Sequence, residues 1–99
     1  MTNIAPITAQ ARPGLCILAG AADKWTGRIR RLSACGAFVE TGGRPEVGTQ
    51  VALAHPEVGA IVAHVSSHGR GGVALGFELT EESSAFAFAV HAHDMTRAA

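Results

Sequence analysis

Along most of this chain, large apolar residues alternate with small or polar ones, which is the pattern of half-buried β-strands. The alternation is clearest from Val73 to Leu79, where every second residue is large and apolar. Other strand-like stretches lie at residues 24–30, 37–41, 49–54 and 60–65, a short apolar run bounded by glycines lies at 15–18, and glycine-rich turns separate most of them. Short strands at this spacing predict an all-β fold with one helix, in which six antiparallel strands form a small β-barrel.

The period of two breaks within the second stretch. Trp25 and Ile29 share one face of the predicted strand, but Leu32 lies an odd number of residues after Ile29. If Ile29 and Leu32 are both buried, the regular alternation has to be interrupted between them. The pattern therefore predicts a β-bulge or a strand end at this point.

The pattern changes again at Thr80, a residue type that caps the N-termini of helices well. Glu81 and Glu82 follow, and the helix dipole favours negative charge in the first turn. The alanine-rich segment after them predicts a C-terminal α-helix from Glu81 to about Asp94.

The predicted helix has two apolar faces, whereas a surface helix normally has one. One face contains Phe86, Val90 and His93, and the nearly opposite face contains Phe88, Ala92 and Met95. The first face can cover an end of the sheet. The second face is either covered by long loops or forms a partner surface, for a second copy of the chain or for another protein. The sequence leaves both alternatives open.

Length and composition limit the class of protein. A chain of 99 residues forms one domain, and with 47% hydrophobic and 16% charged residues it can fold rather than stay disordered. We expect residues 1–13 to be an extended segment and residues 14–99 to be the domain, with the barrel at 14–79 and the helix at about 81–94. The formal net charge of zero argues against binding to a nucleic acid polymer, which needs a basic surplus.

Cys16 and Cys35 are the only cysteines, too few for the disulfide framework of a small secreted protein. The first residues contain no basic segment followed by an apolar run, and no window approaches the length of a membrane span. We therefore expect a cytoplasmic protein with two reduced thiols and no membrane association.

A cationic corner is the most distinctive local feature of the sequence. Arg28, Arg30 and Arg31 lie near the end of the second predicted strand, and Ser33 and Gly36 follow before the next strand begins. Side chains that contact a ligand are commonly placed on such corners. These five residues are therefore candidate ligand-binding residues.

The segment from Ser33 to Thr41, with the flanking segments 46–53 and 72–79, resembles the PilZ domain family in order and spacing. The family's second signature is Asp or Asn, any residue, Ser, any two residues and Gly, followed by a strand. The resemblance covers about residues 14–93. It implies a six-stranded PilZ-like β-barrel with a C-terminal α-helix, and a bacterial signalling role as a receptor or adaptor for the cyclic dinucleotide cyclic di-GMP.

Two positions depart from the family pattern. In the family, an Arg-x3-Arg pair upstream of the first strand grips the ligand, but here the only arginine before Leu15 is Arg12. Arg31 occupies the acidic or amide position, and a guanidinium offers donors but no acceptor for the N–H groups of guanine. Of the matching positions, only Ser33 and Gly36 carry over.

The arginines have two interpretations. Arg28, Arg30 and Arg31 either rebuild an anion site, which binds the nucleotide together with Ser33 and Gly36, or are solvated charges that protect a strand edge. We expect Gly36 to need a positive φ and Ser33 to cap the turn. We favour an adaptor that binds a protein partner or itself, and we keep a cyclic di-GMP receptor as the alternative.

We expect no catalytic residue, no metal site and no cofactor. On a helix, His91 and His93 would point about 200° apart, and His64 and His68 belong to a strand and a turn. The sequence has no phosphate-binding loop and no recognisable nucleophile motif, so we expect the protein not to be an enzyme.

Overall fold

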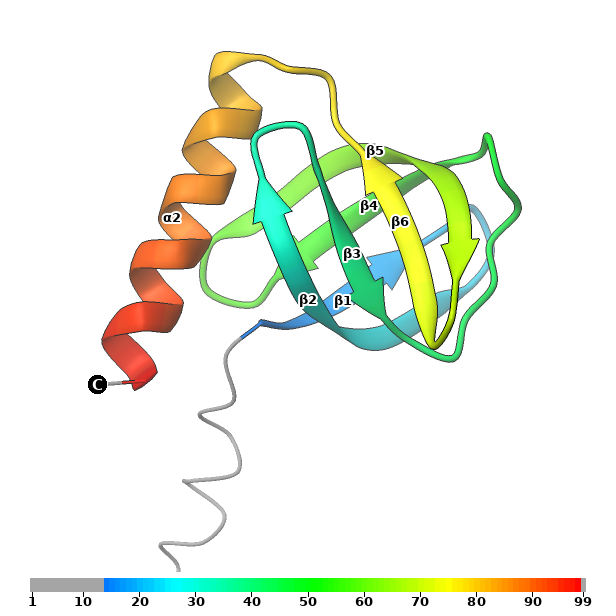
Figure 1. Ribbon diagram of the computed structural model, residues 1–99, viewed down its shortest axis with the longest axis horizontal. Coiled ribbons are helices and arrows are strands. Elements are labelled where there is room, and N and C mark those ends of the chain that lie inside the picture. Colours follow the sequence, from blue (N-terminus) through cyan, green and yellow to red (C-terminus); the bar gives the residue numbers. More distant parts are fainter. Residues whose placement is uncertain (1–13, 99) are drawn as a thin grey trace, which may run out of the picture.

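The structure is a computed structural model that describes residues 14–98, in which six strands close into a barrel beside one helix (Figure 1). The elements in chain order are β1 (Leu15–Ala19), β2 (Lys24–Ser33), β3 (Gly36–Glu40), β4 (Gln50–His55), β5 (Gly59–Gly69), β6 (Gly72–Gly76) and α2 (Glu81–Ala98). The predicted antiparallel barrel with a C-terminal helix is confirmed. The extended segment expected over residues 1–13 lies outside the described residues.

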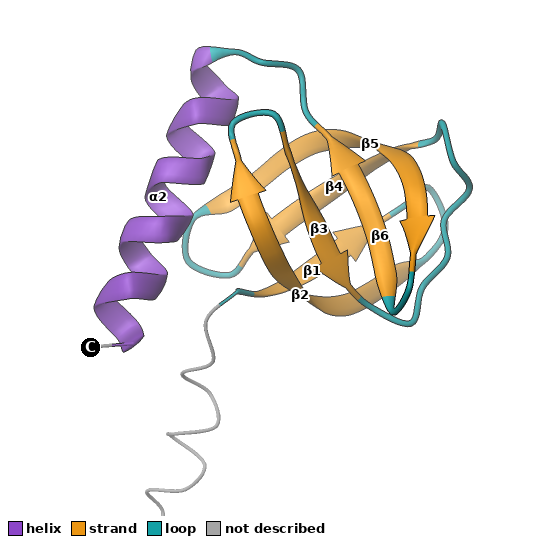
Figure 2. Cartoon of the chain, in the orientation of Figure 1, coloured by secondary structure: helices purple, strands orange, loops and turns teal. Residues whose placement is uncertain are grey.

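The strands follow one another around the barrel in the order β1, β2, β3, β6, β5, β4, and β4 pairs with β1 to close it. All neighbouring strands are antiparallel. The helix α2 stands at one end of the barrel, whereas the turn between β5 and β6 lies at the other end (Figure 2). Each of these strands has a partner on both sides, although β2 extends beyond its pairing with β1 toward Ser33.

The predicted break in β2 is a β-bulge. Ile29 and Leu32 are both buried, and the register between β2 and β3 shifts between Arg30 and Ser33. Arg31 absorbs the shift with a φ of 48°, the only positive φ among the described non-glycine residues. The bulge therefore lets both apolar side chains enter the core and turns Arg31 outward.

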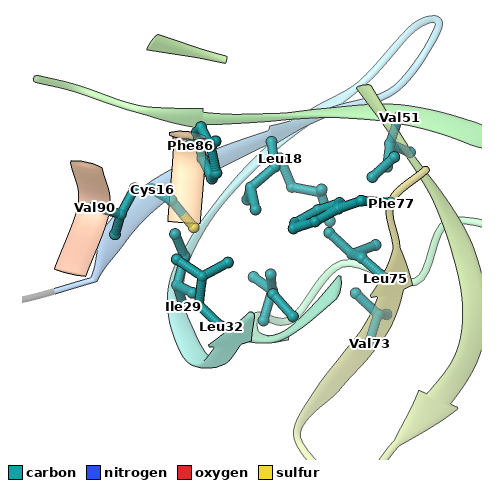
Figure 3. Packing of buried hydrophobic residues seen from close by; sticks show 14 of the residues in the cluster. Cys16, Leu18, Ile29, Leu32, Val51, Val73, Leu75, Phe77, Phe86 and Val90 are labelled. Carbon is teal, nitrogen blue, oxygen red and sulfur yellow. The ribbon is translucent and has the colours of Figure 1, made fainter. Parts of the chain in front are cut away.

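The core fills the barrel and extends under the helix (Figure 3). Alternate residues of the strands point inward, and Leu18, Val39, Leu53, Val65 and Val73 are completely buried. Phe86 and Val90 of α2 point into the same cluster, and the Phe86 ring meets the Phe77 ring edge to face with 6.2 Å between the centroids. The predicted inner face of the helix therefore closes one end of the barrel.

Two details of the sixth strand differ from the prediction. β6 ends at Gly76, and although Phe77 is buried, Leu79 is 69% exposed. After Gly76 the chain leaves the barrel wall to reach α2. The alternation of apolar residues in the sequence therefore extends beyond the strand itself. His68, which the sequence assigned to a turn, lies in a strand, because β5 continues to Gly69 and only Arg70 and Gly71 form the turn.

The helix begins where the sequence predicts. The Ser83 N–H donates to Thr80 Oγ1 at 3.2 Å, and the Thr80 N–H donates to Ser83 Oγ at 2.9 Å. These reciprocal bonds satisfy donors that the first helical turn leaves unpaired. The C-terminal end differs, since α2 continues to Ala98 rather than ending near Asp94. No helix in the described part of the chain combines the length and apolar character that crossing a bilayer requires.

Polar contacts hold the last turns of α2 against the barrel. Asp94 Oδ1 lies 3.1 Å from His55 Nε2 at the end of β4, and Asp94 Oδ2 accepts a hydrogen bond from the Gly14 N–H at 2.9 Å. His91 Nε2 lies 2.9 Å from the Leu32 carbonyl oxygen, which lies just beyond the bulge. The helix is thus fixed both by its apolar face and by these contacts near its C-terminal end.

Gly36 is a close-contact glycine, and the expectation of a positive φ there is wrong. An added Cβ would lie on the Leu75 carbonyl oxygen of the neighbouring strand β6. We expect Gly36→Ala to lower the free energy of unfolding by about 1–3 kcal/mol, because strands β3 and β6 would have to move apart. Urea unfolding measures the change. Gly42→Ala is the control, since nothing lies within 4 Å of a Cβ built there; equal effects of the two substitutions would contradict the steric explanation.

Candidate functional site

The candidate arginines lie on the outer face of β2. Arg28 is paired in register with Glu40 of β3, and Arg30 is paired with Phe38, so these side chains share the outside of the wall. Arg30 and Arg31 are exposed, and Arg28 is half-buried. β1 pairs with β2 only from Lys24 to Arg28, so Arg30 and Arg31 lie beyond that pairing. Their interpretation as solvated charges at a strand edge stays a prediction.

The three guanidinium groups differ in their partners. Arg30 Nε forms an ion pair with Glu40 Oε2 at 3.1 Å, and both side chains are about half exposed. Such a surface pair contributes little stability, but it occupies one of the positive charges. The Arg31 guanidinium carbon lies over the Phe38 ring, 5.7 Å from its centroid. Within the described residues, neither Arg28 nor Arg31 has a carboxylate partner.

Arg31 is common to three depressions on this side of the molecule. The turn depression, about 360 Å³ and shallow, also contains Ser33, Cys35 and Gly36. The helix-side depression, about 250 Å³, lies between the bulge and α2 and contains Arg28, His91 and Asp94. The third, which we call the wall hollow, is about 820 Å³ and reaches the turn between β5 and β6.

The predicted nucleotide-binding residues are therefore divided between two sides of Arg31. Arg28 and Arg30 line the helix-side depression, whereas Ser33 and Gly36 line the turn depression. Ser33 Oγ accepts a hydrogen bond from the Cys35 N–H at 3.2 Å, so it caps the turn as expected. Both residues that match the family signature thus have a local structural role.

Asp94 supplies a carboxylate that the sequence did not place near the arginines. It lines the helix-side depression beside Arg28 and Arg31, yet each of its oxygens already has a hydrogen-bond partner, His55 Nε2 or the Gly14 N–H. No local motif indicates this arrangement, because Asp94 and His55 are 39 residues apart. The main role of the Asp94 carboxylate is therefore to hold the helix in position, and it is not a free acceptor for a ligand.

His55 is a structural residue rather than a metal ligand. Its Nδ1 accepts a hydrogen bond from the Glu57 N–H at 3.1 Å, which leaves the proton of the neutral ring on Nε2, facing Asp94. The His93 ring contacts it edge to face, with 5.3 Å between the centroids. Among residues 14–98, no group of three or more metal-ligating side chains occurs.

The second apolar face of α2 is open to solvent at Phe88. Its side chain is 75% exposed, the highest value among the described large hydrophobic residues, and Ala92 is also exposed. The side chain of Met95 lies outside the described part of the structure. The alternative in which long loops cover this face is wrong at Phe88.

The two thiols lie in opposite environments. Cys35 is exposed in the turn depression, whereas Cys16 is buried in the core, and its burial raises the pKa of the Cys16 thiol to about 12. Burial disfavours the thiolate because the charge would lose its hydration. Cys16 is therefore a packing residue and has no nucleophilic role at neutral pH.

Comparison of the chain with models of known protein families, with curated proteins and with solved structures finds no match. The barrel and its C-terminal helix are the fold that a PilZ domain would have. Membership of that family stays a prediction, based on the segment from Ser33 to Thr41 and its flanks.

We expect the pKa of Cys16 to make the folded state less stable at alkaline pH. Below pH 9.0, the ordinary pKa of the thiol, Cys16 is protonated in both states and this contribution is constant. Between pH 9 and about 12 only the unfolded chain loses the proton, so the free energy of unfolding falls as pH rises.

Urea unfolding across this range measures the slope for the wild type, Cys16→Val and Cys35→Ser. The slope should become shallower in Cys16→Val and persist in Cys35→Ser. Identical slopes in all three proteins would show that Cys16 ionises as easily in the folded state as in the unfolded chain.

Proposed function

We propose that the protein is a bacterial PilZ-like signalling domain that acts in the cytoplasm as a protein-interaction adaptor in cyclic di-GMP-linked regulation. It is not an enzyme, and it does not bind the nucleotide in the manner of the family. The observation that carries this proposal is the exposure of Phe88 on the outer face of a helix whose inner face is anchored in the core.

An exposed phenylalanine on a fixed helix suits protein recognition for a physical reason. Burying a side chain of this size contributes about 1.5–3 kcal/mol, which the folded monomer does not obtain from Phe88. Phe86, Val90 and Asp94 hold the other side of α2, so little order has to be gained when a partner binds. Aromatic residues are enriched at such interfaces.

The cationic corner supports the same proposal because it lacks a free hydrogen-bond acceptor for guanine. Arg31 stands where the family places a guanine acceptor, and a guanidinium has only donors. The nearest groups that could accept are already engaged, since Glu40 pairs with Arg30 and both oxygens of Asp94 have partners. A guanine base at this corner would leave its N–H groups without ready acceptors, which is costly once the site excludes water.

The alternative is a cyclic di-GMP receptor with a remodelled site. One observation favours it: Arg28 and Arg31 line one depression beside Gly14, immediately before the first strand, and neither has a carboxylate partner in the described structure. The family carries its ligand-binding arginines upstream of that strand. Two guanidinium groups in this depression could hold phosphate oxygens.

Titration calorimetry with cyclic di-GMP separates the two proposals. The adaptor proposal predicts that cyclic di-GMP gives no more binding heat than adenosine monophosphate, which has a phosphate but no guanine, while circular dichroism shows an intact fold. The receptor alternative predicts a dissociation constant of about 1 μM or lower, weakened by Arg31→Gly, a substitution that suits the positive φ at this position. Lys24→Ala, which removes an equal charge elsewhere on β2, should leave any such binding unchanged.

Light scattering tests whether the helix mediates self-association. We expect the wild type to form dimers or larger species as concentration rises, and Phe88→Asp to remain monomeric, because a carboxylate cannot be buried at an apolar interface. Val47→Asp places the same charge at an exposed apolar residue outside α2 and should behave like the wild type. A wild type that stays monomeric would exclude self-association as the adaptor mechanism.

A further inference from the structure

The wall hollow is the largest described depression that contains unpaired positive charge. Its lining comes from β2, β3, the end of β5 and the turn after β5, and includes Arg30, Arg31, Phe38, Glu40, Gly69 and Arg70. Its volume of about 820 Å³ is within the range of small-molecule sites. Arg70 was not among the residues singled out from the sequence, because it lies far along the chain from the cationic corner.

Phe38 forms the floor of this hollow. It points outward from β3 and is half-buried against the backbone of Gly69 and Gly72, where an added Cβ would lie 2.9 Å from the ring. The ring therefore needs both glycines. Arg44 Nη1 donates to the Gly69 and Gly72 carbonyl oxygens at 3.0 and 2.8 Å, which holds this end of the β5–β6 pair in place.

Arg31 is partly pre-organised above that floor. Its backbone is held at a φ of 48° by the bulge, and its guanidinium lies over the Phe38 ring. The contact with the ring leaves the guanidinium N–H donors unpaired, since no hydrogen bond from Arg31 occurs within the described residues. Ordering this side chain on binding costs less than ordering a free arginine.

Arg70 contributes a second unpaired charge to the lining of the hollow. It is exposed beside Gly71, and no carboxylate of the described residues pairs with it. Glu40 pairs only with Arg30. Two guanidinium groups are thus left without a counterion around one aromatic floor, a combination that attracts an anion with several acceptor oxygens.

We propose that the wall hollow binds a phosphate group of a small molecule, held between Arg31 and Arg70. This site shares Arg31 with the turn depression but does not include Ser33, and the proposal does not depend on the adaptor function. Guanidinium forks match phosphate oxygens in pairs, whereas chloride offers no such geometry. Phe38 contributes by holding Arg31 in position rather than by contacting the phosphate.

Calorimetric titration of the full chain with inorganic pyrophosphate and, separately, with adenosine monophosphate tests the proposal at constant ionic strength. We expect both to bind and Arg70→Ala to weaken each about tenfold or more, the usual effect of losing a hydrogen bond to a charged group. Arg31→Gly should weaken them similarly, with the backbone conformation kept. The tighter ligand shows whether the site takes inorganic phosphate or a phosphorylated organic molecule.

Two further variants make the test specific. Glu40→Gln removes the only carboxylate of the hollow and should tighten binding several-fold, whereas Lys24→Ala removes an exposed charge elsewhere and should have no effect. The proposal is overturned if neither phosphate compound binds. It is also overturned if Arg70→Ala binds as the wild type does, or if Lys24→Ala weakens binding as much as Arg70→Ala, since the attraction would then be non-specific.

Discussion

The bulge in β2 is the constraint on which the rest of the structure depends. Ile29 and Leu32 can both reach the core only if the strand breaks its alternation between them, and Arg31 takes the strained backbone conformation that results. The same distortion turns Arg31 outward, where it lines all three depressions on this side of the molecule. A packing requirement in the core thus determines where the positive charge is presented.

Closure of the barrel determines which surfaces remain for binding. Every described strand is paired on both sides over at least part of its length, which favours recognition through side-chain surfaces over the addition of a strand to an edge. The helix α2 offers such a surface, because Phe86 and Val90 are buried while Phe88 faces solvent. The contacts of Asp94 with His55 and Gly14 keep that orientation from changing.

The two residues that carry the resemblance to PilZ domains, Ser33 and Gly36, have structural roles in the backbone of this chain. Ser33 caps the turn, and Gly36 allows β3 to approach β6 closely. Such positions can maintain a fold while the ligand chemistry around them changes, because backbone geometry does not require the neighbouring side chains to stay the same. The chain is neutral overall, yet among the described residues Arg31 and Arg70, both without a carboxylate partner, line one hollow, so composition alone conceals the local charge.

By itself, the sequence determined the six strands, the interruption of the second strand and the helix start at Thr80, since each depends on periodicity or on capping between near neighbours. It left open whether Phe88 is covered or exposed, which the packing of α2 decided. The predicted sixth strand was too long, because the alternation of apolar residues continues to Leu79 after β6 has ended, and Leu79 is exposed. Only the tertiary structure decided which charges are neutralised and which stay free. Glu40 pairs with Arg30, Asp94 contacts His55, and Arg70 lines the same hollow as Arg31. Barrel closure brings these distant segments together, and no local sequence pattern predicts the contacts.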